Sequence, residues 1–97
     1  GLELRVFGDP DEPLGRIEII EYQQLKGENL YPRAKPPATG ILHMNYRVKD
    51  LAPIRTRLRA AQMRITEHGA LNTLYGSGPL LSCYSPAGFR IEIQGET

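Results

Sequence analysis

The sequence lacks most of the features that mark membrane, secreted or nucleic-acid-binding proteins. Its 97 residues include one cysteine, Cys83, so no disulfide can form within the chain, as is usual in the reducing cytoplasm. No apolar run approaches the roughly 20 residues of a membrane-spanning helix. Charged residues make up 24% of the chain and the formal net charge is +1, a balance that gives no reason to expect nucleic acid or an anionic membrane. We therefore expect a cytoplasmic protein with neither of these partners.

What is present suffices for one small domain or part of one. Hydrophobic residues make up 40% of the chain, although a chain this short buries a smaller share of its surface than a larger domain does. The strand-like pattern starts at Leu2 with no preceding loop or cap. We expect that the chain begins within a larger structural unit.

The first part of the chain predicts a β-hairpin over residues 2–22. Leu2–Phe7 alternates apolar with other side chains, Gly8–Gly15 is rich in Gly, Pro and Asp, and Arg16–Tyr22 is rich in isoleucine. Alternation is typical of a half-buried strand, and the turn residues favour a chain reversal. Residues 23–40 contain three prolines, which are unfavourable inside a helix or a central strand. We predict a linker there.

The second part, residues 41–95, predicts a strand, a helix and three further strands. Asp50 is a typical N-cap residue, Pro53 suits a first helical turn, and apolar residues then recur at spacings of three and four. The predicted fold is therefore α+β, a βαβββ module preceded by a hairpin. The predicted segments are strand Ile41–Val48, helix Leu51–Met63, strand Arg64–Glu67, loop His68–Gly78, strand Pro79–Tyr84, turn Ser85–Gly88 and strand Phe89–Gln94. A short strand near Leu74 within the loop is left open as an alternative.

The four residues RIEI occur twice, at Arg16–Ile19 and at Arg90–Ile93. Each copy follows a strand and a turn, since LELRVF precedes the first copy and LLSCYS precedes the second. A four-residue identity can arise by chance, but the shared hairpin context favours an internal duplication. We interpret the first copy as the end of a first module that lacks its front half.

Alternation places Glu18, His43 and Glu92 near strand centres, opposite the apolar faces of their strands. A glutamate in mid-strand is disfavoured and costly to bury without a partner. Two carboxylates and an imidazole would offset this cost by sharing a cation, because both groups are ordinary ligands of transition metals. A second interpretation stays open: one face of an antiparallel sheet is often solvated, and these are then surface polar groups. The apolar faces, including that of Ile17 and Ile19, are expected to pack on helix.

The stretch ILHMNYRVKDL at Ile41–Leu51, then a predicted helix, then YSPAGFRIEI at Tyr84–Ile93, resembles the second module of the vicinal oxygen chelate superfamily. This superfamily includes glyoxalase I, bleomycin-resistance proteins, methylmalonyl-CoA epimerase and extradiol dioxygenases. Its unit is a βαβββ module, and two modules pair into a half-closed cup. The resemblance is good over residues 41–94 and weaker over residues 2–21, and Ser85 stands where the family's turn carries aspartate.

By position, the resemblance implies that His43 and Glu92 are metal ligands from the second module and that Glu18 is the matching ligand from the first. It implies a divalent transition metal (Zn, Ni, Co, Mn or Fe) as cofactor, with Glu92 and Glu18 as candidate catalytic bases. A further family ligand comes from a strand that this chain does not contain. We therefore expect either a fragment or a cup that another subunit completes.

The resemblance implies a lyase- or isomerase-type reaction on a small carbonyl substrate. In glyoxalase-like members the metal holds the oxygens of an enediolate formed by proton removal next to a carbonyl. Two alternatives stay open: a metal-free protein that sequesters a small molecule, as bleomycin-resistance proteins do, and a fragment of an extradiol dioxygenase. The residues expected to line a substrate pocket are Asn45, Arg47, Tyr84 and Arg90.

A homodimer is expected, because six predicted strands leave unpaired edges and exposed edges favour pairing with another chain. The strands of one chain would then complete the sheet of the other.

Some reactive or charged residues are given no functional role. His68 is interpreted as a solvated loop residue, and Cys83 as a buried structural thiol. Four arginines in or just after the predicted helix fall mostly outside its apolar stripe, and we interpret them as a solvated face: Arg55, Arg57, Arg59 and Arg64.

Overall fold

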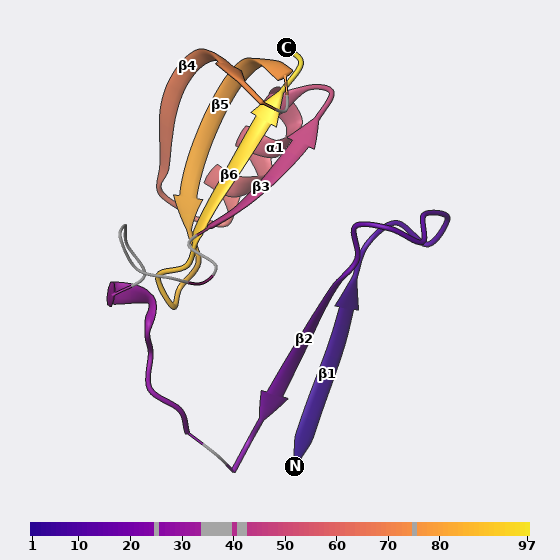
Figure 1. The fold of residues 1–97 in the computed structure, drawn as a ribbon, viewed down its shortest axis with the longest axis vertical. Coiled ribbons are helices and arrows are strands. Elements are labelled where there is room, and N and C mark those ends of the chain that lie inside the picture. The colour runs from indigo at the N-terminus through magenta and orange to yellow at the C-terminus, as the bar shows by residue number, and fades with distance from the viewer. Residues whose placement is uncertain (25, 34–39, 41–42, 75) are drawn as a thin grey trace.

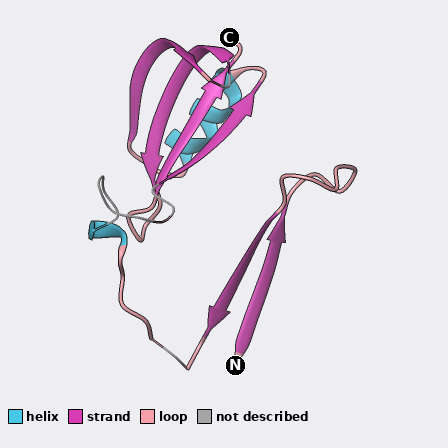
Figure 2. Ribbon diagram, in the orientation of Figure 1, coloured by secondary structure: helices cyan, strands magenta, loops and turns pink. Residues whose placement is uncertain are grey.

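The computed structural model describes residues 1–24, 26–33, 40, 43–74 and 76–97. These residues form an α+β fold in which a hairpin precedes a βαβββ module, as the sequence predicts (Figures 1 and 2). The elements in chain order are β1 (Leu2–Phe7), β2 (Ile17–Tyr22), the 3-10 helix η1 (Tyr31–Arg33), β3 (His43–Val48), α1 (Leu51–Ala60), β4 (Ile65–Thr73), β5 (Gly76–Tyr84) and β6 (Arg90–Gly95).

The module is a four-stranded sheet covered on one face by helix α1 (Figure 1). Its strands lie in the order β3, β6, β5, β4, with β3 parallel to β6 and the other pairs antiparallel. The buried apolar core includes Leu51 of α1 with Leu81 and Cys83 of β5, all at most 2% exposed. The predicted burial of Cys83 is confirmed, and that burial raises the pKa of its thiol.

Helix α1 begins where the sequence predicts. The Asp50 carboxylate accepts a hydrogen bond from the backbone N–H of Ala52 at 3.0 Å, which satisfies one of the free donors at the start of the helix. Pro53 lies in the first turn, where its missing N–H costs nothing.

The helix ends at Ala60, three residues before the predicted end at Met63. Gln62 takes a φ of 60°, in the left-handed region, and therefore cannot continue the helix. Its N–H bonds to the Arg59 carbonyl, and the Met63 N–H bonds to the Leu58 carbonyl. This pattern closes a helix, usually with glycine in the place of Gln62. Because glutamine is not typical of that position, the helix end could not be predicted from the residue type.

The predicted loop at His68–Gly78 is wrong, because most of this segment lies in the paired strands β4 and β5. Its glycines favoured a loop, but two of them are required by the sheet. The β4–β5 register shifts at a bulge just before Gly69, and a side chain at Gly78 would collide with the carbonyl oxygen of Gly95. Glycine inside a strand commonly marks such a bulge or close approach.

The remaining elements match their predicted positions closely. Strands β2, β5 and β6 each begin and end within three residues of their predicted bounds. The turn Ser85–Gly88 is closed by a hydrogen bond from the Gly88 N–H to the Ser85 carbonyl at 2.8 Å. Ile41 and Leu42, which were expected to start β3, lie outside the described residues.

The linker contacts the β5–β6 turn. The Asn29 side-chain amide donates to the Ala87 carbonyl at 2.9 Å, and the rings of Tyr31 and Phe89 are 5.1 Å apart at their centroids. Residues 25 and 34–39 of the predicted linker lie outside the described residues.

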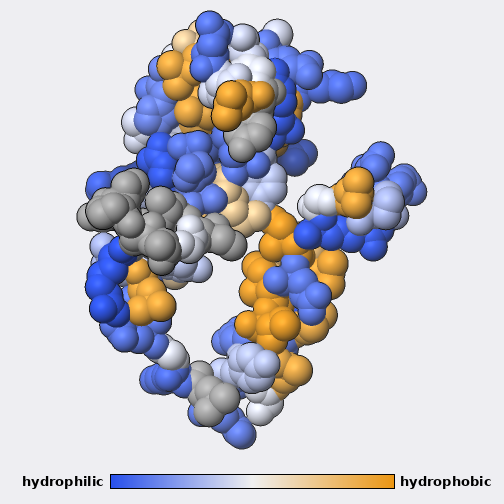
Figure 3. Space-filling view, in the orientation of Figure 1, coloured by the Kyte–Doolittle hydropathy of each residue, from blue (hydrophilic) through white to orange (hydrophobic). Residues whose placement is uncertain are grey.

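The hairpin β1–β2 forms a sheet of its own, with Val6 opposite Glu18 (Figure 1). Ile19 is 53% exposed, so the expectation that the Ile17 and Ile19 face packs on a helix is wrong within the chain. The opposite face carries Glu18 among apolar side chains. Hydrophobic residues cover much of the visible side of the hairpin in Figure 3. The apolar residues of that face are 47% to 60% exposed: Leu2, Leu4, Val6, Ile20 and Tyr22.

In the described parts of the chain, no helix is both long and apolar enough to cross a membrane.

Candidate functional site

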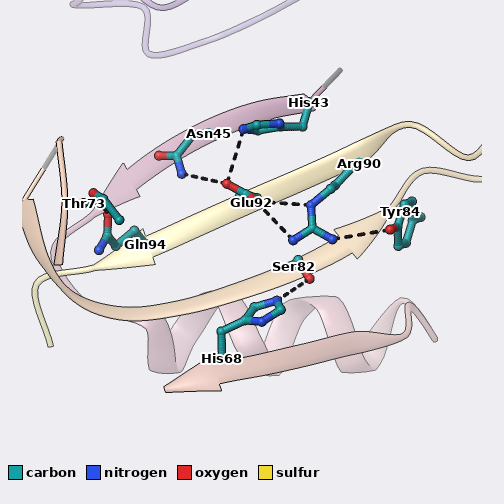
Figure 4. Close-up of polar contacts among 9 residues, drawn as sticks. All are labelled: His43, Asn45, His68, Thr73, Ser82, Tyr84, Arg90, Glu92 and Gln94. Atoms are coloured by element: carbon teal, nitrogen blue, oxygen red, sulfur yellow. Dashed lines mark hydrogen bonds and ion pairs between the residues drawn. The ribbon is translucent and has the colours of Figure 1, made fainter. Parts of the chain in front are cut away.

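The face of the four-stranded sheet opposite α1, which we call the open face, carries most of the residues that the sequence singles out. Leu51 of α1 would touch a Cβ placed at Gly95, so Gly95 and its alternate neighbours in β6 face the helix. Arg90 and Glu92 therefore lie on the open face (Figure 4). In the β3–β6 pair, Asn45 is the register partner of Glu92.

The two oxygens of the Glu92 carboxylate have different surroundings (Figure 4). Oε1 lies 3.4 Å from Nε2 of His43 and 3.4 Å from Nδ2 of Asn45, at the long end of the hydrogen-bonding range. Oε2 accepts two hydrogen bonds from Arg90, from Nε and from Nη2, each at 3.1 Å. The Glu92 side chain is 18% exposed, so it sits largely out of water.

These neighbours keep Glu92 ionised. Partial burial alone raises the pKa of the Glu92 carboxyl, but the hydrogen bonds from Arg90 and Asn45 and the charges of His43 and Arg90 outweigh burial, so the pKa lies below its ordinary value. An ionised carboxylate next to an imidazole nitrogen is a suitable pair of donors for a transition metal.

Tyr84 and Arg90 are also in contact. They are register partners in the β5–β6 pair, and Arg90 Nη1 donates to the Tyr84 hydroxyl at 3.3 Å. The guanidinium carbon lies 5.9 Å from the centre of the Tyr84 ring. Arg90, predicted as a pocket residue, thus binds Tyr84 on one side and Glu92 on the other.

Arg47 is placed apart from this group. It shares a strand face with Asn45 by alternation, but its Nη2 donates to the Ser77 carbonyl at 3.2 Å. Its guanidinium lies against the backbone at Gly76. The expectation that Arg47 helps to line a substrate pocket stays a prediction.

Glu18 is not brought to the other two predicted ligands within the chain. It lies on β2, in the separate two-stranded sheet. Among the described residues, no three His, Cys, Asp or Glu side chains are close enough together to hold one metal ion. Of the predicted set Glu18, His43 and Glu92, a single chain therefore assembles only the last two.

His68, interpreted from the sequence as a solvated loop residue with no functional role, also lies in this region. It lies on β4, where its Nε2 is 2.7 Å from the Ser82 hydroxyl (Figure 4), and Ser82 is the register partner of Glu92. The interpretation as a loop residue is therefore wrong. Extending the predicted strand Arg64–Glu67 by one residue would have placed His68 in the sheet.

The geometry of His43 and Glu92 suits a shared metal ion. With Nε2 and Oε1 3.4 Å apart, an ion about 2.1 Å from both atoms would make an angle of roughly 110° between them, which is close to tetrahedral. The imidazole side chain is 45% exposed, so an ion could reach it from solvent. The two donors fit a divalent transition metal, and the remaining positions need ligands from elsewhere.

No protein-family model and no curated protein matches the chain. A solved structure, the crystal structure of SMU.1112c, is similar in fold, with a TM-score of 0.58 and 20% sequence identity. The similarity covers 97% of this chain and 80% of that one, so it extends over both the hairpin and the module. At this identity the similarity establishes the fold alone.

Proposed function

We propose that this chain is a member of the vicinal oxygen chelate superfamily that binds a divalent transition metal on its open face and acts as a lyase or isomerase on a small carbonyl substrate. The observation that carries the proposal is the 3.4 Å separation of His43 Nε2 and Glu92 Oε1. These are the donors that the family resemblance assigns to the second module.

The third ligand, Glu18, is proposed to come from a second copy of the chain. A two-stranded hairpin alone is marginally stable in water, yet this one exposes apolar side chains such as Leu4 and Val6, at 51% and 56%. Exposed apolar patches of this kind commonly mark protein–protein contacts. A homodimer in which each hairpin covers the partner's open face would bury them and bring Glu18 to His43 and Glu92.

The proposed roles of the two glutamates differ. Glu92 serves as a fixed ligand, because both of its oxygens already have donors. Glu18 has no hydrogen-bond donor among the described residues and lies between apolar side chains, so it is the better base for removing a proton next to the substrate carbonyl. The metal, when bound, supplies the positive charge that stabilises the developing oxyanion.

A second function is supported by one observation. His43, Asn45 and Arg90 together give Glu92 partners on both oxygens without any ion. A metal-free protein that sequesters a small molecule on the open face is therefore the alternative.

Metal analysis separates the two functions. After loading with Zn²⁺, Ni²⁺ or Co²⁺ and dialysis, the full chain is expected to retain close to one ion per chain, and Glu92→Ala or Glu18→Ala to retain far less. Glu21→Ala is the matched control, because Glu21 lies on the other face of the same hairpin. A wild-type protein that retains no ion of any of the three metals contradicts the metal-dependent function and leaves sequestration.

A further inference from the structure

We propose that Arg90 is a positioning residue that fixes Glu92 as a ligand through a single oxygen, a role that rests on the proposed metal site. Arg90 and Glu92 are two residues apart on β6 and therefore share the open face. Arg90 directs both Nε and Nη2 at the same oxygen, Oε2, at 3.1 Å each. Its side chain is 31% exposed, so these hydrogen bonds are partly shielded from water.

This contact leaves the other oxygen, Oε1, directed at His43. Turning the carboxylate so that both oxygens face His43 would break the two hydrogen bonds from Arg90. Hydrogen bonds between ionised partners are roughly twice as strong as neutral ones, so this rotation is costly. Glu92 is thereby held for ligation by Oε1 alone, at the spacing from Nε2 that suits a near-tetrahedral ion.

Arg90 is in turn held by Tyr84. The third guanidinium nitrogen, Nη1, donates to the Tyr84 hydroxyl at 3.3 Å, and the guanidinium carbon is 5.9 Å from the ring centre. Tyr84, Arg90 and Glu92 therefore form one connected row across β5 and β6 (Figure 4). Partners of this kind behind a ligand typically change metal affinity by about 10- to 100-fold.

The charge and the geometry of Arg90 have opposite effects on metal binding. Its positive charge repels a cation, whereas its fork of donors orients the ligand. Arg90→Lys keeps the charge and loses the rigid fork, since lysine is a point charge on a flexible stem. This variant therefore isolates the positioning effect, and a neutral substitution would mix both effects.

The test is a titration of the full-length protein with Co²⁺. Calorimetry measures the affinity, and the visible absorption of the bound ion reports its coordination. Arg90→Lys is expected to bind Co²⁺ about 10-fold more weakly or worse. The released carboxylate can then bind through both oxygens, so the Co²⁺ absorption should weaken as the coordination number rises. Tyr84→Phe removes only the hydroxyl group that Arg90 contacts. It should lower the Co²⁺ affinity and the Co²⁺ absorption as well, but by less than Arg90→Lys does.

Arg47→Lys is the matched control. Arg47 also belongs to the open face, on β3, but it donates to the Ser77 carbonyl and not to Glu92. The Co²⁺ affinity and the absorption spectrum of Arg47→Lys should therefore equal those of the wild type. Wild-type affinity and spectrum in Arg90→Lys, with the wild type binding Co²⁺, would overturn the role of Arg90 alone. A wild type that binds no Co²⁺ would contradict the proposed function as well. Circular dichroism of each variant checks that the fold is retained.

Discussion

His43 on β3 and Glu92 on β6 bring Nε2 and Oε1 to within 3.4 Å of each other across a parallel strand pair. The pairing of the first and last strands of the module produces this contact between residues far apart in the sequence. Alternation puts both side chains on the open face. The hydrogen bonds from Arg90 orient the carboxylate and, with its other neighbours, keep it ionised against the opposing effect of burial.

The hairpin face around Glu18 predicts the oligomeric state. Leu4→Asp places a charge on this face, where Leu4 is 51% exposed in one chain, and should shift a dimer toward monomer. Burying a leucine contributes about 1.5–3 kcal/mol, so the dissociation constant should rise at least about tenfold. Light scattering over a concentration series measures the shift.

Leu14→Asp is the control for this substitution, because Leu14 is 83% exposed and lies in the turn between β1 and β2. It should leave the dissociation constant unchanged. A wild type that is monomeric at all concentrations, or equal effects of the two substitutions, would rule out the interface.

The lowered pKa of Glu92 predicts how stability depends on pH. A group whose pKa is lower in the folded state stabilises the fold above its unfolded pKa, and this contribution is lost as the pH falls through the folded value. The wild type should therefore exceed Glu92→Gln by on the order of 1 kcal/mol in unfolding free energy at pH 7, and the difference should shrink below about pH 4. Urea unfolding at several pH values measures it. A difference that grows on acidification would mean that the pKa of Glu92 is raised.

The end of helix α1 predicts a stabilising substitution. Gln62 has a φ of 60°, a region that costs a residue with a Cβ roughly 1 kcal/mol and costs glycine little. Gln62→Gly should therefore raise the melting temperature, by roughly 4–8 °C per kcal/mol for a domain of this size. Gln62→Ala keeps the Cβ and should give no such gain. Equal melting temperatures for Gly and Ala at this position would argue against the left-handed conformation.

The sequence predicted the order of elements because alternation and capping are local signals. Asp50 and Pro53 sufficed to place the start of α1. The helix end and the continuation of β4 beyond Glu67 were missed because the backbone conformations there depend on tertiary contacts. Gln62 takes a conformation usually reserved for glycine, and Gly78 is needed for close approach to Gly95 and not for a loop.

The site was predictable only in part. Alternation assigns a residue to a face, and this was enough to propose His43 and Glu92 together. It does not reveal which neighbours a side chain contacts, so the hydrogen bonds from Arg90 to Glu92 and the pairing of His68 with Ser82 were not foreseen. Glu18 could not be brought to the site because its hairpin forms a separate sheet within the chain.

Combining two variants that each lose metal binding tests most directly whether the site is shared between two chains. Glu18→Ala and His43→Ala are each expected to lose metal binding, because each removes one ligand from every site of a homodimer. When the two chains are co-expressed and purified together, a mixed dimer has one site that keeps both Glu18 and His43, so retained metal should rise well above that of either variant alone. Metal retention in the mixture equal to the mean of the separate variants would contradict a site built from two chains.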